Sequence, residues 1–123
     1  MIIANFNSVN GILYTTITGP TTIDDLNDWL KGINSNNVQE SCLKLITDAR
    51  NASYNFTADD SKPNDKILKD LCARYTWIKA AVIHKNPKET ALSMVMKTRV
   101  GIPNYTQMIF STLEAAENWI MNF

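Results

Sequence analysis

The chain has 123 residues, of which 45% are hydrophobic and 20% charged, a balance typical of one folded domain rather than of a disordered segment. Lysine and arginine together number 12, as do aspartate and glutamate, so the formal net charge is zero. No basic run is present either. Both observations argue against nucleic-acid binding, which needs a concentration of positive charge.

The sequence also argues against secretion, membrane insertion and common cofactor chemistry. The start, MIIANFNSVNG, lacks the features of a signal peptide, and no apolar run reaches the roughly 18–20 residues that span a bilayer. We therefore expect a cytoplasmic protein. Cys42 and Cys72 are too few and too far apart for a disulfide framework or a zinc site, and we expect both to be buried and inert. Phosphate-loop, dinucleotide, nucleophile-elbow and zinc-protease motifs are missing, so we expect no enzyme, no cofactor and no metal.

The first part of the chain is predicted to form a hairpin. Segments 1–6 and 12–18 are rich in the β-branched and aromatic residues that favour strands. The Asn-Gly pair at 10–11 is typical of a tight hairpin turn, so the two strands should pair antiparallel. The Gly-Pro pair at 19–20 is expected to end the second strand.

A helix is predicted to follow. Thr21 is a suitable cap, and Asp24 and Asp25 suit the positive end of a helix, with Asp24 at its third position. Apolar residues then recur at helical spacing, with Trp29 beside them. The asparagine-rich stretch 34–37 is expected to end this helix.

The stretch LKLITDARNASYNFTADD, at 43–60, is the most informative part of the sequence. LKLIT is typical of a buried strand, which we expect over 43–47 and which would end at Asp48. A long polar loop is expected over about 49–62. Because ligands of open α/β sheets bind just beyond the carboxyl ends of parallel strands, a site is expected near this loop.

The remainder alternates between helices and strands. Apolar spacing predicts helices over 66–75, 87–99 and 113–120 and strands over 77–83 and 107–110. On the helix over 87–99, the spacing turns four residues inward: Ala91, Leu92, Val95 and Met96.

Capping residues support two of these helices. Asn86 before Pro87, with Glu89 in a box-like position, is typical of a helix start. Ser111 followed three residues later by Glu114 matches the capping box of the last helix.

The resulting element order is ββαβαβαβα in a single domain over 1–123. Strands that alternate with helices form parallel neighbours joined by right-handed crossovers. The expected fold class is therefore α/β with a mixed five-stranded sheet.

This order resembles the SpoIIAA-like group, which contains the anti-sigma-factor-antagonist (STAS) domains. The resemblance covers nearly the whole chain and rests on the opening hairpin, LITDARNASYNFTADD, AAVIHKNPKETALSMVM and the closing IFSTLEAAENWI. The last two segments look like a subgroup of small bacterial SpoIIAA-like proteins of unknown function. The resemblance implies a SpoIIAA-like superhelix with helices mainly on one face of the sheet. Part of the other face would stay open, and self-association as a homodimer could cover it.

The resemblance also implies a position for a switch. In STAS domains a D-S-S-G-type motif follows the third strand, and phosphorylation of one serine controls partner binding. This sequence has neither the serine pair nor the glycine. Thr57 is the nearest hydroxyl, and Ser53 is a second candidate. Thr57 can equally cap the following helix, with Asp60 three residues on.

Two groups of charged residues are candidates for binding a ligand or a partner. Asp48 could anchor a ligand or, alternatively, pair with Arg50. His84, the single histidine, precedes Lys85 and a helix start, where an anion could bind. The alternative for His84 is a local hydrogen bond at the end of its strand.

Aromatic residues on the two expected long loops form a further candidate group. Tyr54 and Phe56 belong to the first loop, and Ile102 and Tyr105 belong to the second, over 98–106. They could line a pocket or a partner surface, or they could fold over the core.

Two functions follow from these candidates. The first is a non-enzymatic regulatory or interaction module that binds a protein partner, as STAS domains do. The alternative is a small-molecule binder that holds an apolar or anionic ligand at the strand ends. A pocket lined by Tyr54, Phe56, His84 and Tyr105 would favour the binder, whereas a flat apolar patch would favour the partner module.

Overall fold

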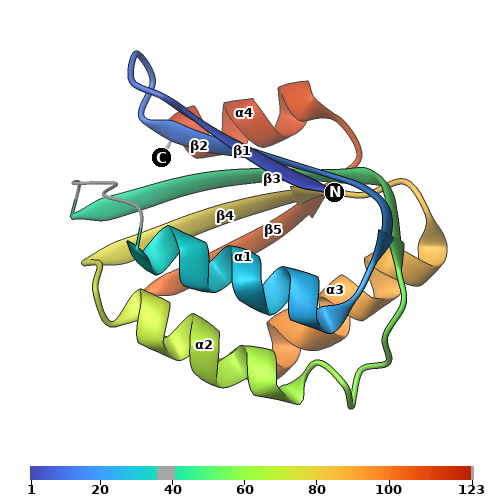
Figure 1. Ribbon diagram of the computed structural model, residues 1–123. Coiled ribbons are helices and arrows are strands. Elements are labelled where there is room, and N and C mark those ends of the chain that lie inside the picture. The colour runs from blue at the N-terminus through green and yellow to red at the C-terminus, as the bar shows by residue number, and fades with distance from the viewer. Residues whose placement is uncertain (36–40, 123) are drawn as a thin grey trace.

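The computed structural model describes residues 1–35 and 41–122. Two strands open the chain, and helices then alternate with strands (Figure 1). The strands are β1 (Ile2–Asn7), β2 (Ile12–Thr21), β3 (Cys42–Tyr54), β4 (Trp77–Ile83) and β5 (Tyr105–Phe110). The helices are α1 (Ile23–Ser35), α2 (Lys62–Cys72), α3 (Pro87–Val100) and α4 (Leu113–Met121).

The strands form one sheet in the order β1-β2-β3-β4-β5. β1 pairs antiparallel with β2, and the other neighbours are parallel. The predicted mixed five-stranded sheet and the order ββαβαβαβα are therefore confirmed. In Figure 1, α1, α2 and α3 cover one face of the sheet and α4 lies on the other, so the helices are mainly on one face, as expected.

Alternate residues of each strand supply the two faces of the sheet. On β4, Ile78 and Ala80 pack in the cluster below α1 and α2. Ala81 and Ile83 belong to a second cluster, together with Ala116 and other residues of α4 and its neighbours. We call these the three-helix face and the α4 face.

β3 is much longer than predicted, and this changes the place of several candidates. The strand continues beyond Asp48 to Tyr54, because β2 also continues and pairs with it as far as Thr21. The expected end of β2 at 19–20 is wrong for the same reason. The pairing of β1 with β2 ends before residues 19–20. Because Pro20 has no β1 neighbour, its missing N–H removes no hydrogen bond to that strand. A bulge after Asp48 shifts the register of the β2–β3 pair.

The helix starts differ from the expected caps. Thr22, not Thr21, caps α1: its hydroxyl accepts from the Asp25 N–H at 3.2 Å, and the Asp25 carboxylate accepts from the Thr22 N–H at 2.9 Å. Asp24 is therefore not the reciprocal partner. Thr112, not Ser111, caps α4 by accepting from the Ala115 N–H. α1 is described to Ser35, so part of its expected end at 34–37 lies outside the described residues.

Three further predictions about helices and strands are corrected. α2 begins four residues before position 66 and ends before 75, and β5 begins at Tyr105 rather than at 107. Asn86 occupies the cap position of α3, but its side chain makes no capping bond. Glu89 does not complete a box there, because its carboxylate is buried and accepts from the Tyr54 N–H at 3.3 Å.

The inward face of α3 is also different from the prediction. Ala91 and Val95 are exposed, whereas Ser93 is buried and Leu92 and Met96 are half-buried. Thus α3 turns a polar residue, Ser93, toward the sheet. No helix among the described residues is long and apolar enough to cross a membrane.

The two cysteines are free thiols in different surroundings. Cys72 is buried in the core, and burial raises the pKa of its thiol to about 11. Cys42 is only half-buried, so the expectation that both are buried is wrong for this residue.

Candidate functional site

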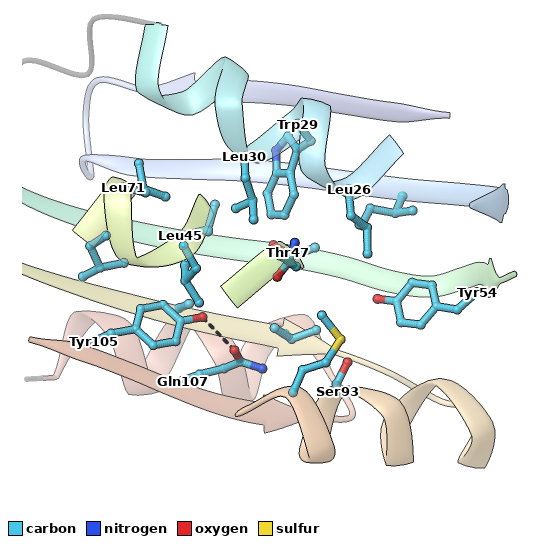
Figure 2. Close-up of a pocket in the computed structure, with 17 residues that line it drawn as sticks. Leu26, Trp29, Leu30, Leu45, Thr47, Tyr54, Leu71, Ser93, Tyr105 and Gln107 are labelled. Carbon is cyan, nitrogen blue, oxygen red and sulfur yellow. Dashed lines mark hydrogen bonds between the residues drawn. The ribbon is translucent and has the colours of Figure 1, made fainter. Parts of the chain in front are cut away.

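A cavity of about 100 Å³ lies between the three-helix face of the sheet and helices α1, α2 and α3 (Figure 2). Most of its wall is apolar: Ile17, Leu26, Trp29, Leu30, Leu45, Leu68, Leu71, Ile78, Ala80, Val82 and Met96. The polar residues of the wall are Thr47, Tyr54, Asn64, Ser93, Tyr105 and Gln107. None of the described residues that line it is charged.

Residue size on the central strands explains why space remains here. Ala80 and Val82 are the cavity-facing residues at the carboxyl half of β4, and Thr47 faces the cavity from β3. These side chains are short, while the helices that face them are held away by larger residues such as Leu30 and Leu71. Protein interiors pack to high density, so a void of this size is a specific feature of the fold.

Several polar groups of the wall already have partners. The Tyr105 hydroxyl donates to the Gln107 side-chain oxygen at 2.7 Å, as the dashed line in Figure 2 shows. The Asn64 amide donates to the Asn27 side-chain oxygen at 3.0 Å, which joins α2 to α1.

The other polar end of the cavity is formed by Tyr54 and Ser93, and His84 lies next to them. The Ser93 Oγ lies 2.6 Å from His84 Nε2, a hydrogen-bond distance. The Tyr54 ring meets the His84 ring edge-on, with centroids 5.7 Å apart. The three residues meet because Tyr54 ends β3, His84 follows β4 and Ser93 lies in the second turn of α3.

Burial sets the ionisation of this cluster. His84 is 3% exposed, and desolvation lowers the pKa of its imidazole although Glu89 nearby acts in the opposite direction. Burial also raises the pKa of the Tyr54 hydroxyl to about 12. At neutral pH the histidine and the tyrosine are therefore both uncharged.

Buried polar atoms without a hydrogen-bond partner among the described residues include Trp29 Nε1, Thr15 Oγ1 and His84 Nδ1. Such groups are rare, because an unpaired buried donor or acceptor costs roughly 1–3 kcal/mol. Trp29 is the one of these residues that lines the cavity. In Figure 2 its ring comes down from α1 toward Thr47, and the Tyr54 hydroxyl points toward the same region.

The charged candidates lie elsewhere. Asp48 follows Thr47 on β3, so its side chain points to the α4 face and away from the cavity. The Arg50 guanidinium donates to it at 2.8 and 3.0 Å, which is the pairing left open above, and these bonds hold the pKa of Asp48 below its usual value. Lys85 is exposed and donates to Asn51 at 3.2 Å.

The remaining candidates are also outside the cavity wall. Phe56 is buried, and its ring stacks on the Tyr54 ring with centroids 5.1 Å apart, so it helps to fix the position of Tyr54. The Thr57 hydroxyl accepts from the Asp60 N–H at 3.2 Å, and the Asp60 carboxylate accepts from the Thr57 N–H at 2.9 Å. The predicted Thr57–Asp60 pair therefore forms, but it caps the turn before α2 and not α2 itself, whose N-cap position is Ser61. Ser53 is exposed.

The predicted pocket is therefore only partly the one observed. Tyr54 and Tyr105 line it, but from strands rather than loops, and His84 lies behind Tyr54 and Ser93. Sequence reasoning missed Ser93 and Gln107 and gave Trp29 no role. One signal was available in the sequence: Ser93 comes four residues after Glu89. Residues at this spacing lie on the same face of a helix, so two polar side chains share one face of α3.

The His84–Ser93 contact has the form of a base and a serine nucleophile, but the surroundings do not match that use. Ser93 lies inside α3, where backbone N–H groups are engaged in helix hydrogen bonds. Such groups cannot form the pair of free donors that stabilises an oxyanion. No group of three or more metal-binding side chains occurs within residues 1–35 and 41–122.

Comparison with solved structures places the chain in a known fold. A crystal structure of an uncharacterized protein of the DUF3478 family, from Shewanella loihica PV-4, has a SpoIIAA-like fold and aligns with a TM-score of 0.65. The alignment covers 98% of this chain and 92% of the other, at 12% sequence identity. The chain has a SpoIIAA-like fold. No family model and no curated protein sequence matches it, so the comparison establishes the architecture of this SpoIIAA-like domain and leaves its function to the site.

Proposed function

We propose that this SpoIIAA-like domain is a non-catalytic binding protein for a small, largely apolar molecule. The cavity between the sheet and α1–α3 carries this proposal, because its wall is mostly apolar and its volume is about 100 Å³. Ligand sites are concave and mainly apolar, with a few polar groups that set orientation.

Packing energetics support occupation of the cavity. An empty apolar cavity costs roughly 24 cal/mol per Å³, so this one costs about 2 kcal/mol. A ligand that fills the space recovers part of this free energy. An apolar cavity of roughly 150 Å³ accepts benzene, which has six non-hydrogen atoms, so the part of the natural ligand inside this smaller cavity has about four.

The chemistry of the wall supports binding rather than catalysis. The described lining side chains are uncharged, and the backbone N–H groups around Ser93 are engaged in the hydrogen bonds of α3. The charged pair Asp48–Arg50 lies on the other face of the sheet and consists of one carboxylate held by one guanidinium. Such a pair offers no second titrating group for acid–base chemistry.

A second candidate function, a protein-interaction module, is favoured by an exposed apolar surface. Met94 and Val95 on α3 are 56% and 46% exposed, and Met108 on the edge strand β5 is 39% exposed. The Lys97 ammonium lies 3.9 Å from the Met108 sulfur and so joins the two elements. A protein partner or a second copy of the chain could cover this surface. A concentration-dependent mass from sedimentation, abolished in Val95→Lys, would support self-association there.

The binder is tested by titrating the protein with dissolved xenon, which is small enough for this cavity, and following backbone amide signals by NMR. We expect saturable shifts confined to the cavity wall, and loss of these shifts in Ala80→Ile, which fills the cavity. Thr16→Ile is the matched control, since it adds the same side chain at an exposed strand position. Absence of saturable binding to the wild-type protein, or equal binding to Ala80→Ile, would refute the proposal.

Native mass spectrometry of protein purified from its own host identifies the natural occupant. A small molecule released by denaturation, and absent from purified Ala80→Ile, is the expected result.

A further inference from the structure

The free edge of the sheet at β1 points to a further interaction surface. β1 pairs with β2 on one side, and no described segment pairs with it on the other. Figure 1 shows β1 and β5 at opposite edges of the sheet. We propose that two copies of this chain associate through β1, antiparallel and related by a two-fold axis, so that their sheets become one. This inference is independent of the cavity and of its ligand.

The hydrogen-bond pattern shows which backbone groups of β1 are free. The Met1 amine donates to the Thr18 carbonyl at 2.6 Å, and the Met1 carbonyl accepts from the Thr18 N–H at 2.9 Å. In an antiparallel pair, every second residue exchanges bonds with its neighbour in this way. The backbone N–H and C=O groups of Ile2, Ala4 and Phe6 therefore point away from β2, toward the open edge. A strand that pairs there must bond to these three residues.

These backbone groups fit a second copy of the same strand. If the two-fold axis passes beside Ala4, Ala4 pairs with Ala4 of the second copy, and Ile2 pairs with Phe6 of the second copy. Each pair then exchanges both of its N–H···O bonds. Any other symmetric register sets at least one of the three residues opposite a position outside β1. The register centred on Ala4 is therefore the one that satisfies the whole edge.

The side chains of the paired strands would also match. Ile2 packs with residues of α1 on the three-helix face, and Ala4 and Phe6 share that face by alternation. Phe6 is 43% exposed and would lie opposite Ile2 of the second copy, a favourable pair of an aromatic and a β-branched residue. On the other face, Ile3 is 51% exposed and would lie opposite Asn5. The dimer thus covers two large apolar side chains that one copy exposes.

β1 lacks the features that usually protect the edge of a sheet from pairing. Edge strands are commonly protected by charged side chains, proline or a bulge. The sequence of β1, IIANFN, has no charged residue and no proline, and its register with β2 is continuous. On the opposite edge, the Lys97 ammonium lies 3.9 Å from the Met108 sulfur of β5, so a charge accompanies that strand. This contrast favours β1 over β5 as the site of strand pairing.

The charges nearest to β1 favour the antiparallel arrangement. Asp25 and Asp28 of α1 border a hollow together with Met1 and Ile2, at the beginning of β1. Antiparallel pairing sets this end against the hairpin turn of the second copy, where residues 7–11 are uncharged. Parallel pairing would set the aspartates of the two copies side by side, where like charges repel.

Sedimentation equilibrium of the wild-type protein and of Ala4→Pro tests the association. We expect the wild-type mass to rise with concentration from that of one chain to that of two. Ala4→Pro removes an N–H that points away from β2, so the β1–β2 pair is retained while two bonds between the copies are lost. The dimer Kd should rise roughly thirtyfold or more. Val95→Lys, on the exposed surface of α3, is the control and should leave the Kd unchanged.

A second variant keeps the test valid if Ala4→Pro does not fold, as its amide NMR spectrum would show. Phe6→Lys places a charge at an exposed position of the same edge and should also weaken the dimer. A wild-type protein that stays monomeric at every concentration would overturn the proposal. So would a dimer that Val95→Lys abolishes and the β1 variants leave intact, because that dimer would form through α3.

Cysteine cross-linking tests the register. In Ala4→Cys the two introduced residues face each other with Cα atoms about 5.5 Å apart, a separation that a disulfide spans. In Phe6→Cys, on the same face, the two introduced residues are roughly 14 Å apart along the strands. Under mild oxidation we expect a covalent dimer from Ala4→Cys, and neither from Phe6→Cys nor from the wild-type protein, whose Cys42 sets the background. Cross-linking of Phe6→Cys, or none of Ala4→Cys, would overturn the register.

Discussion

The two faces of the same sheet are packed in different ways. On the α4 face, Ala81 and Ile83 of β4 pack tightly with Ala116 and Ile120 of a single short helix. On the three-helix face, Ala80 comes from the same strand, is equally buried, and borders a cavity. Where a single helix packs on the sheet, short side chains on a strand therefore allow that helix to approach the strand closely. They leave space where several helices, held apart by their own contacts, form the opposite wall.

The faces also differ in how they hold a buried base. Lys79 is 1% exposed on the α4 face, with its ammonium 4.8 Å from the centre of the Trp119 ring, a cation–π contact. His84 on the other face is uncharged and hydrogen-bonded to Ser93. One face thus contains a buried amine whose charged form is disfavoured by burial, and the other contains a neutral histidine next to a cavity.

The largest difference between the faces should appear when a large side chain is removed. Ile83→Ala should lower the free energy of unfolding by about 4 kcal/mol, and Ile78→Ala by about 2 kcal/mol, because Ile78 already lacks contacts on its cavity side. Urea unfolding of both variants measures this. Equal losses would mean that the two faces are packed alike.

Adding a small group to each face should have opposite effects. Ala81→Val should destabilise the protein by about 1–3 kcal/mol, since the α4 face has no room for two more methyl groups. Ala80→Val should be neutral or stabilising, because its methyl groups enter the cavity. Thermal unfolding of the two variants provides the comparison, and destabilisation by Ala80→Val comparable to that of Ala81→Val would contradict the cavity.

The buried bases should give the two faces different pH dependences. Folding lowers the pKa of His84 through burial. Below the ordinary histidine pKa near 6.5, the unfolded chain therefore binds more protons than the folded protein does. Stability should therefore decrease as the pH falls from about 6.5 toward 5, and His84→Gln should remove part of this decrease. Unfolding measured across this range would show identical slopes for the two proteins if His84 were solvated.

Lys79 acts in a different pH window. Burial, and secondarily the nearby Lys44, lower the pKa of its ammonium. As the pH approaches the ordinary lysine pKa near 10.4, the unfolded chain therefore binds more protons than the folded protein does. Stability should rise with pH in this range. In Lys79→Met this rise should be smaller, as urea unfolding at neutral and alkaline pH would show. A larger rise in the variant would contradict the burial of the amine.

The sequence predicted the fold better than the site, and the reasons are physical. Alternating strands and helices, the Asn-Gly turn at 10–11 and the apolar run of β4 are local signals, and the structure confirms the order that they predict. The end of β3 depends instead on pairing with β2, a partner distant in sequence. The polar loop composition after Asp48 therefore suggested a loop where a strand continues.

The cavity could not be predicted for a related reason. Its wall combines residues from three helices and four strands, and its volume depends on how far the helices stand from the sheet. Tyr54 and Tyr105 were chosen as loop aromatics, and they reach the wall from strands. Ser93 drew no attention, because a serine within a helix is usually solvated, and only the tertiary fold brings it to His84.

The central claim is that the three-helix face holds an accessible apolar site, whereas the α4 face does not. A crystal of the protein pressurised with xenon tests this most directly, because xenon enters apolar cavities without requiring polar contacts. We predict a xenon atom beside Ala80 and Leu45 on the three-helix face, and none between the sheet and α4. Xenon absent from the three-helix face, or bound only at the α4 face, would contradict the account.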